Sequence, residues 1–139
     1  DGSYSLLVKN VATKSGAKML PTTVTVAGLK DNTAPQLTSA VVTGNAQIEL
    51  TFDESVEFAS GAQNNFIVTV NGVKIDVAAV TADATNDKVL VLTTTSTFNY
   101  DSTVKVKTTL DASQDAFVTD LGGNALKVNI EKTATKGIQ

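Results

Sequence analysis

Apolar and polar residues alternate with a period of two along most of this chain, which is the pattern of strands with one buried face. The alternation is clearest at residues 47–52, 66–71 and 126–131. After residue 33 it predicts seven short strands, at residues 36–43, 46–52, 66–71, 73–80, 88–94, 103–109 and 126–132. This number and spacing favour an all-β fold, an immunoglobulin-like antiparallel β-sandwich.

Two of these strands are joined by Asn71 and Gly72. Asn-Gly is the preferred pair of a two-residue hairpin turn, because both residues tolerate positive φ angles. We therefore expect the strands on either side of this pair to be antiparallel neighbours.

The segment LKDNTAPQLTS at residues 29–39 predicts a joint between two parts of the chain. Asp31 and Asn32 favour turns through their side chains, and Pro35 restricts its own φ and the conformation of Ala34. A chain of 139 residues has room for one core of ordinary size, so this joint should separate a domain from a fragment.

An internal similarity explains the position of the joint. Residues 1–32 and 100–134 each contain a strand ending in Val-Lys, a glycine-containing loop and a second alternating strand, with Val8-Lys9 matching Val106-Lys107 and Gly16 falling near Gly123. The predicted organisation is a hairpin of a preceding repeat at residues 1–30, a linker at 31–35, a sandwich domain at 33–132 and a tail or linker at 133–139. Alternatively, the two hairpins resemble each other by chance, or residues 4–27 simply add strands to the main sheet.

Composition excludes several classes of chemistry. The chain has no Cys, His or Trp, and all 11 of its basic residues are lysines. Thiol and imidazole catalysis and the usual zinc sites are therefore absent, and we expect no enzyme activity. The net charge of −3 and the lack of Arg argue against nucleic acid as a partner, and no apolar run is long enough for membrane insertion.

The order of the motifs resembles a known family. DNTAPQLTSAVV, IELTFDESVEF, FIVTVNG and TDLGGNALKV together resemble the immunoglobulin-like repeats of Gram-positive bacterial surface-layer (S-layer) proteins. In such repeats a D-x-T-x-P linker opens the domain and a D-x-x-G-N turn precedes the last strand. The early copy departs from this pattern, since it has Thr-Lys-Ser-Gly at residues 13–16.

The resemblance implies a structural repeat that forms the stiff body of a self-assembling lattice outside the cell, on the cell wall. Its expected partners are other copies of the same protein and neighbouring repeats, with cell-wall anchoring through another domain. The resemblance also implies that calcium holds adjoining domains in register.

The predicted positions of the acidic residues are consistent with a calcium site. If seven strands run alternately down and up, nine of the 14 acidic residues lie on loops at one end of the sandwich: Asp31, Asp53, Glu54, Glu57, Asp83, Asp87, Asp111, Asp115 and Asp120. Calcium prefers six to eight oxygen ligands, which such loops can supply. The candidate ligands are Asp31, Asp53, Glu54, Asp120 and Asn124.

Two alternatives remain open at this point. The acidic residues can be solvated turn residues and caps, of which Asp111 is an example. The chain can also be an immunoglobulin-like stalk repeat of a cell-surface adhesin, which would share the fold. A lattice unit should associate with its own copies, whereas a stalk unit should remain monomeric.

Overall fold

The computed structural model describes residues 2–9, 12, 14–18, 20, 22–29 and 31–137. The chain forms two compact units, Asp1–Asn32 and Thr33–Gln139. Of the predicted segments, residues 1, 10, 11, 13, 19, 21 and 30 of the hairpin and 138–139 of the tail lie outside the described residues. Among the described residues, no helix has the length and hydropathy to cross a bilayer.

The first unit is a two-stranded antiparallel ribbon. Strand β1 (Gly2–Val8) pairs with β2 (Thr22–Leu29), from Val8 opposite Thr22 to Gly2 opposite Leu29. Gly16, in the loop between them, has φ 86°, a conformation that glycine adopts without strain. The predicted hairpin is present, and its origin in a preceding repeat remains a prediction.

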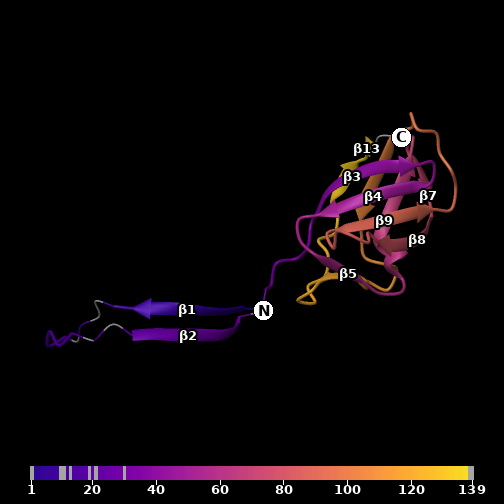
Figure 1. Ribbon diagram of the computed structural model, residues 1–139. Helices are drawn as coiled ribbons and strands as arrows, with labels where there is room; N and C mark the ends of the chain where they lie inside the picture. The colour runs from indigo at the N-terminus through magenta and orange to yellow at the C-terminus, as the bar shows by residue number, and fades with distance from the viewer. Residues whose placement is uncertain are drawn as a thin grey trace. The chain divides into compact units, whose positions relative to one another are not determined.

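The second unit is an all-β sandwich, as the alternation predicts (Figure 1). Its strands are β3 (Leu37–Gly44), β4 (Gln47–Phe52), β5 (Val56–Phe58), β6 (Phe66–Val70), β7 (Val73–Ile75), β8 (Val77–Ala82), β9 (Val89–Thr94), β10 (Val104–Thr108), β11 (Val118–Asp120), β12 (Glu131–Thr133) and β13 (Thr135–Lys136). One sheet has the order β13-β3-β4-β9-β8, the other has β12-β10-β6-β7, and β5 and β11 form a separate pair. An immunoglobulin-like connectivity stays a prediction.

The core lies between the two larger sheets. Every second residue of β4 is buried, namely Ile48, Leu50 and Phe52, and β10 buries Val104 and Val106 in the same cluster. Since the polar residues between them face outward, the period-two pattern is what places the apolar side chains in one core. Burying a side chain of this size contributes about 1.5–3 kcal/mol to folding.

The predicted turn at Asn71-Gly72 is confirmed. Strands β6 and β7 are antiparallel, with Val70 opposite Val73, and Asn71 and Gly72 have φ angles of 49° and 84°. Asn71 is also held by its side chain, since its Oδ1 accepts a hydrogen bond of 2.9 Å from the backbone N–H of Thr103. The turn thereby fixes the pairing register of β6 and β7.

The predicted single strand at residues 73–80 is instead two strands. β7 belongs to the sheet of β6, whereas β8 pairs with β9 in the other sheet. The chain changes sheets at Asp76, between them. The alternation continues through this crossing, so the pattern alone gives no sign of it.

The predicted strand at residues 126–132 is wrong for most of its length. Asn129 has φ 62°, a left-handed conformation that interrupts a strand, and regular pairing of β12 begins only at Glu131. The domain also continues past the predicted boundary at residue 132. Thr135 and Lys136 form β13, which pairs in parallel with Val41 and Val42 of β3.

Candidate functional site

The loops at one end of the sandwich are joined to one another by backbone hydrogen bonds. The N–H of Asp53 donates to the carbonyl of Gln36 at 3.1 Å, and the N–H of Val56 donates to that of Asp87 at 2.9 Å. The N–H of Lys127 donates to the carbonyl of Pro35 at 2.9 Å. Segments that are far apart in sequence therefore meet where the acidic loops were expected to converge.

A short pair of strands places two of the candidate ligands close together. β11 is antiparallel to β5, and Asp120 lies opposite Val56. Glu54 precedes Val56 by two residues. Val56 and Val118 are buried and anchor both strands in the core. Asp120 thus lies on a paired strand, and Glu54 lies in the bend two residues before the strand that pairs with it.

Asp120 organises the turn that follows it. Its Oδ1 accepts the backbone N–H of Asn124 and its Oδ2 accepts the Nδ2 group of Asn124, both at 2.7 Å. A Cβ on Gly122 would lie 3.3 Å from Oδ1 of Asp120, closer than most side-chain contacts. Glycine at this position therefore lets the backbone approach the carboxylate. Asp120 is 3% exposed.

These hydrogen bonds favour the ionised carboxylate. The side-chain hydrogen bond from Asn124 lowers the pKa of Asp120 below 3.8, against the opposing effect of desolvation, and backbone N–H groups of residues 122–124 add to the lowering. Asp120 therefore stabilises the fold at pH values above 3.8. That contribution is lost as the pH falls through the lower pKa of the folded state.

Replacing Asn124 by Ala should raise the pKa of Asp120, because the largest cause of its lowering is removed. NMR titration of the Asp120 carboxyl carbon, in the presence of chelator, measures this pKa in both proteins. When the pH is lowered through 3.8, the free energy of unfolding should also fall less in Asn124→Ala than in the wild type. An identical titration curve in the two proteins would contradict this account of the turn.

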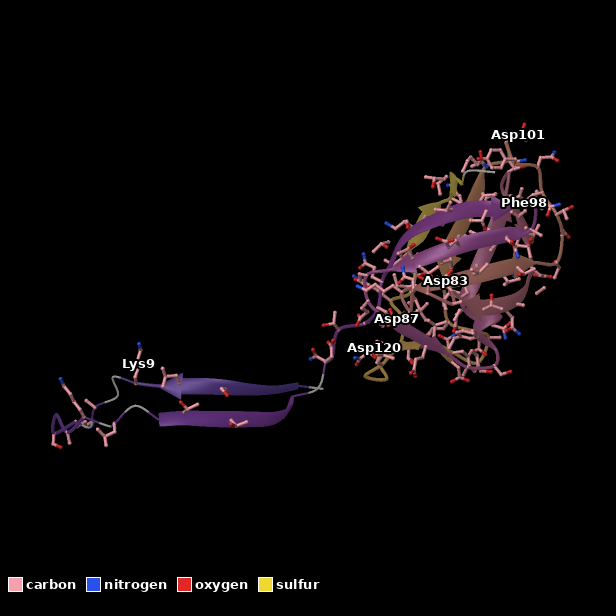
Figure 2. All side chains as sticks on the ribbon, viewed as in Figure 1. Lys9, Asp83, Asp87, Phe98, Asp101 and Asp120 are labelled. Atoms are coloured by element: carbon pink, nitrogen blue, oxygen red, sulfur yellow. The ribbon has the colours of Figure 1, made fainter. Side chains whose placement is uncertain are left out.

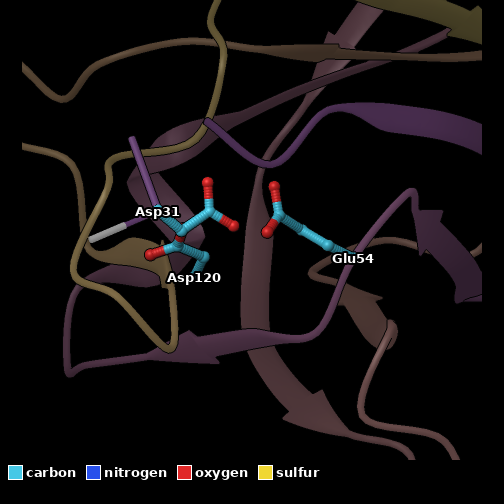
Figure 3. A group of neighbouring side chains, drawn as sticks. All are labelled: Asp31, Glu54 and Asp120. Carbon is cyan, nitrogen blue, oxygen red and sulfur yellow. The ribbon is translucent and has the colours of Figure 1, made fainter. Parts of the chain in front are cut away.

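Three of the five candidate ligands form a cluster of carboxylates. One carboxylate oxygen from each of Asp31, Glu54 and Asp120 lies within 4.8 Å of the others. Figure 3 shows the three side chains as neighbours. Asp31 precedes the second unit by two residues, in the predicted linker. Whether these side chains bind a metal remains a prediction.

The other two candidates have different surroundings. The Oδ1 of Asp53 accepts the backbone N–H of Gln36 at 2.8 Å, so Asp53 fixes the start of β3. Asn124 holds Asp120 through the hydrogen bonds described above. Asp53 is not a member of the carboxylate cluster.

Two of the remaining acidic residues, Asp83 and Asp111, act as turn caps. The Oδ1 of Asp83 accepts hydrogen bonds from the N–H and hydroxyl of Thr85, at 2.8 and 2.7 Å. The Oδ1 of Asp111 accepts the N–H groups of Ser113 and Asp115, both at 2.8 Å. The capping expected for Asp111 is therefore confirmed, and turn chemistry accounts for part of the acidic asymmetry.

The ends of the sandwich differ in the acidic residues that they carry. Asp83, Asp87 and Asp120 lie toward one end, and Asp101 lies at the other (Figure 2). Capping of turns does not explain why Glu54 and Asp120 lie close together, because a capping carboxylate gains nothing from a second negative charge nearby. Their proximity is repulsive unless a cation or a proton offsets it.

The chemistry of the cluster fits a hard divalent cation. All three donors are carboxylates, which calcium and magnesium prefer, and there is no thiolate or imidazole in the chain for zinc. Calcium binds oxygen at about 2.3–2.6 Å, so two ligands on opposite sides of one ion lie about 4.6–5.2 Å apart. The separations within the cluster are compatible with one shared ion.

Sequence reasoning missed the elements that build this site. Neither β5 nor β11 was expected, since VEF at 56–58 and VTD at 118–120 are each only three residues long. The buried Asn65, which fixes the loop before β11, was also missed. Its Nδ2 donates to the carbonyls of Thr109 and Asp115, at 3.1 and 3.0 Å.

The fold is similar to that of known bacterial surface-layer domains. The N-terminal part of the bacterial S-layer protein SbsC matches 76% of this chain with a TM-score of 0.59 and 20% identity, and domains 1-6 of SbsC match with the same values. The chain spans 24% and 14% of the lengths of those two structures. No curated protein shows a significant match to the chain.

A repeat family matches the sequence itself. The family described as "Putative flagellar system-associated repeat" matches residues 30–113, which include the linker and the sandwich as far as the loop after β10. This match covers more than half of the chain. The chain belongs to this repeat family.

Proposed function

We propose that the chain is a non-catalytic structural repeat of a self-assembling bacterial surface-layer protein, located at the cell surface. The observation that carries the proposal is the course of the chain through the second unit. β3 and β13 are parallel, so the chain enters the sandwich at one end and leaves it at the other (Figure 1). Repeats with this geometry can be joined end to end.

The structural similarity supports the surface-layer part of the proposal. Domains of the S-layer protein SbsC share the fold over 76% of this chain. Other copies of the same protein and neighbouring repeats would be its partners, and another domain would provide the cell-wall anchor. The hairpin of residues 1–30 would be the last hairpin of a preceding repeat.

Calcium would stiffen the joint between repeats. Asp31, Glu54 and Asp120 would hold the ion, with backbone or water oxygens completing its shell. Because Asp31 belongs to the predicted linker, one ion could fix the linker against the loops that follow β4 and β11. Calcium would thereby link the rigidity of the array to the extracellular ion concentration.

Self-association distinguishes this function from that of an adhesin stalk. Sedimentation velocity of the chain at increasing concentration, with calcium, should show a sedimentation coefficient that rises with concentration. Such association is the expected behaviour of a unit that packs against its own copies. A monomer at every concentration, with and without calcium, would instead favour the stalk.

A further inference from the structure

The last strand of the second unit is held against its first strand. Thr135 and Lys136 of β13 pair in parallel with Val41 and Val42 of β3. The N–H of Gly137 extends the pairing by donating to the carbonyl of Val42 at 2.9 Å, and the hydroxyl of Thr135 donates to the carbonyl of Ala40 at 3.4 Å.

The loop before β10 reinforces the same segment through the side chain of Tyr100 and the backbone of Ser102. The hydroxyl of Tyr100 donates to the carbonyl of Gly137, and the Nζ of Lys136 donates to the carbonyl of Ser102. Lys136 also lies over the Tyr100 ring, 5.6 Å from its centre. On the inner side, Ala134 is buried and its N–H donates to the carbonyl of Val104 at 2.8 Å.

We propose that the β3–β13 pair, with the Tyr100 and Lys136 contacts, is a force-bearing clamp that resists extension of the repeat. This inference rests on the proposed role as an end-to-end structural repeat. Tension would enter before β3 and leave after β13. Because the strands are parallel, this tension acts along them in opposite directions and loads their hydrogen bonds together rather than one after another.

Gly137 offers a way to weaken the clamp locally. A Cβ built on Gly137 would lie 2.8 Å from the carbonyl oxygen of Val42, a contact that real Cβ atoms do not make. Gly137→Ala must therefore displace the end of β13 from β3. Gly44→Ala is a matched control at the same end of the strand pair, since Gly44 ends β3 and its Cβ would meet only the flexible side chain of Gln47, at 3.4 Å.

Single-molecule force spectroscopy of the whole chain, in chelator, tests the proposal. Handles at the two termini load the β3–β13 pair in shear. Handles at Asn45→Cys and at the C-terminus pull on the same end of both strands, so they peel β13 from β3. The chain has no cysteine, so the thiol attachment is unique, and Asn45 is exposed in the turn between β3 and β4.

The unfolding force should be at least about twofold higher in shear than in peeling, because several hydrogen bonds must break together. Gly137→Ala should lower the shear force, and Gly44→Ala should leave it unchanged. Equal forces in the two geometries, or an unchanged shear force in Gly137→Ala, would overturn the clamp. Since no calcium or assembly is involved, either result is independent of the test of the proposed function.

Discussion

Asn65→Ala should lower the free energy of unfolding of the second unit by about 3 kcal/mol, since it removes three hydrogen bonds at about 1 kcal/mol each and leaves their backbone partners unpaired. Asn65 is fully buried. Its Nδ2 donates to the carbonyls of Thr109 and Asp115, and its Oδ1 accepts the N–H of Phe117 at 2.6 Å. Urea unfolding should show a lower midpoint with an unchanged slope.

Asn64→Ala is the matched control for this prediction. Asn64 is the neighbouring asparagine of the same 3₁₀ helix, Ala62–Asn65, and it is exposed. Its replacement should change stability by no more than about 0.5 kcal/mol. Equal effects of the two substitutions would show that the loop of residues 109–117 does not depend on Asn65.

Calcium should stabilise the chain through the carboxylate cluster. At free calcium a hundredfold above the dissociation constant, binding to the native state adds about 2.7 kcal/mol. For a domain of this size the melting temperature should rise by about 10 °C or more. Magnesium should be a poorer substitute, because it demands a smaller octahedral shell and gives up its water reluctantly.

Glu54→Gln should remove this stabilisation while keeping the shape of the side chain. In chelator the variant should be at least as stable as wild type, because it relieves repulsion from Asp31 and Asp120. In calcium it should melt lower than wild type. Glu57→Gln is the control, since Glu57 is an exposed acid three residues away that lies outside the cluster. A full calcium response in Glu54→Gln would assign the ion to another site.

The parts of the fold that follow from local pattern were predictable. The hairpin at Asn71-Gly72 is specified by two residues that tolerate positive φ, and the strands of the core are specified by alternation such as that of residues 48–52. In both cases the deciding interactions lie within a few residues of one another.

The parts that depend on partners distant in sequence were not predictable. Whether residues 73–80 form one strand or two depends on which sheet each half pairs with, and β13 exists only because β3 is beside it. β5 and β11 are too short for a periodic signal, and each is stabilised by the other. Their pairing is a tertiary event that local propensity does not encode.

The same distinction holds for the candidate site. The convergence of the acidic loops follows from strand alternation, and the proximity of Asp31, Glu54 and Asp120 agrees with that expectation. The role of Asp53 could not be predicted from strand alternation, because its carboxylate accepts a hydrogen bond from the backbone N–H of Gln36. This hydrogen bond depends on which segments meet at this end of the sandwich, and strand alternation alone does not specify that.

Calorimetric titration of calcium into the chelator-treated chain tests the central claim most directly. The account predicts a saturable heat of binding at one site, a melting temperature that rises with free calcium, and the loss of both in Glu54→Gln. An absence of binding heat together with an unchanged melting curve across millimolar calcium would contradict it, and would leave the acidic residues as solvated turns and caps.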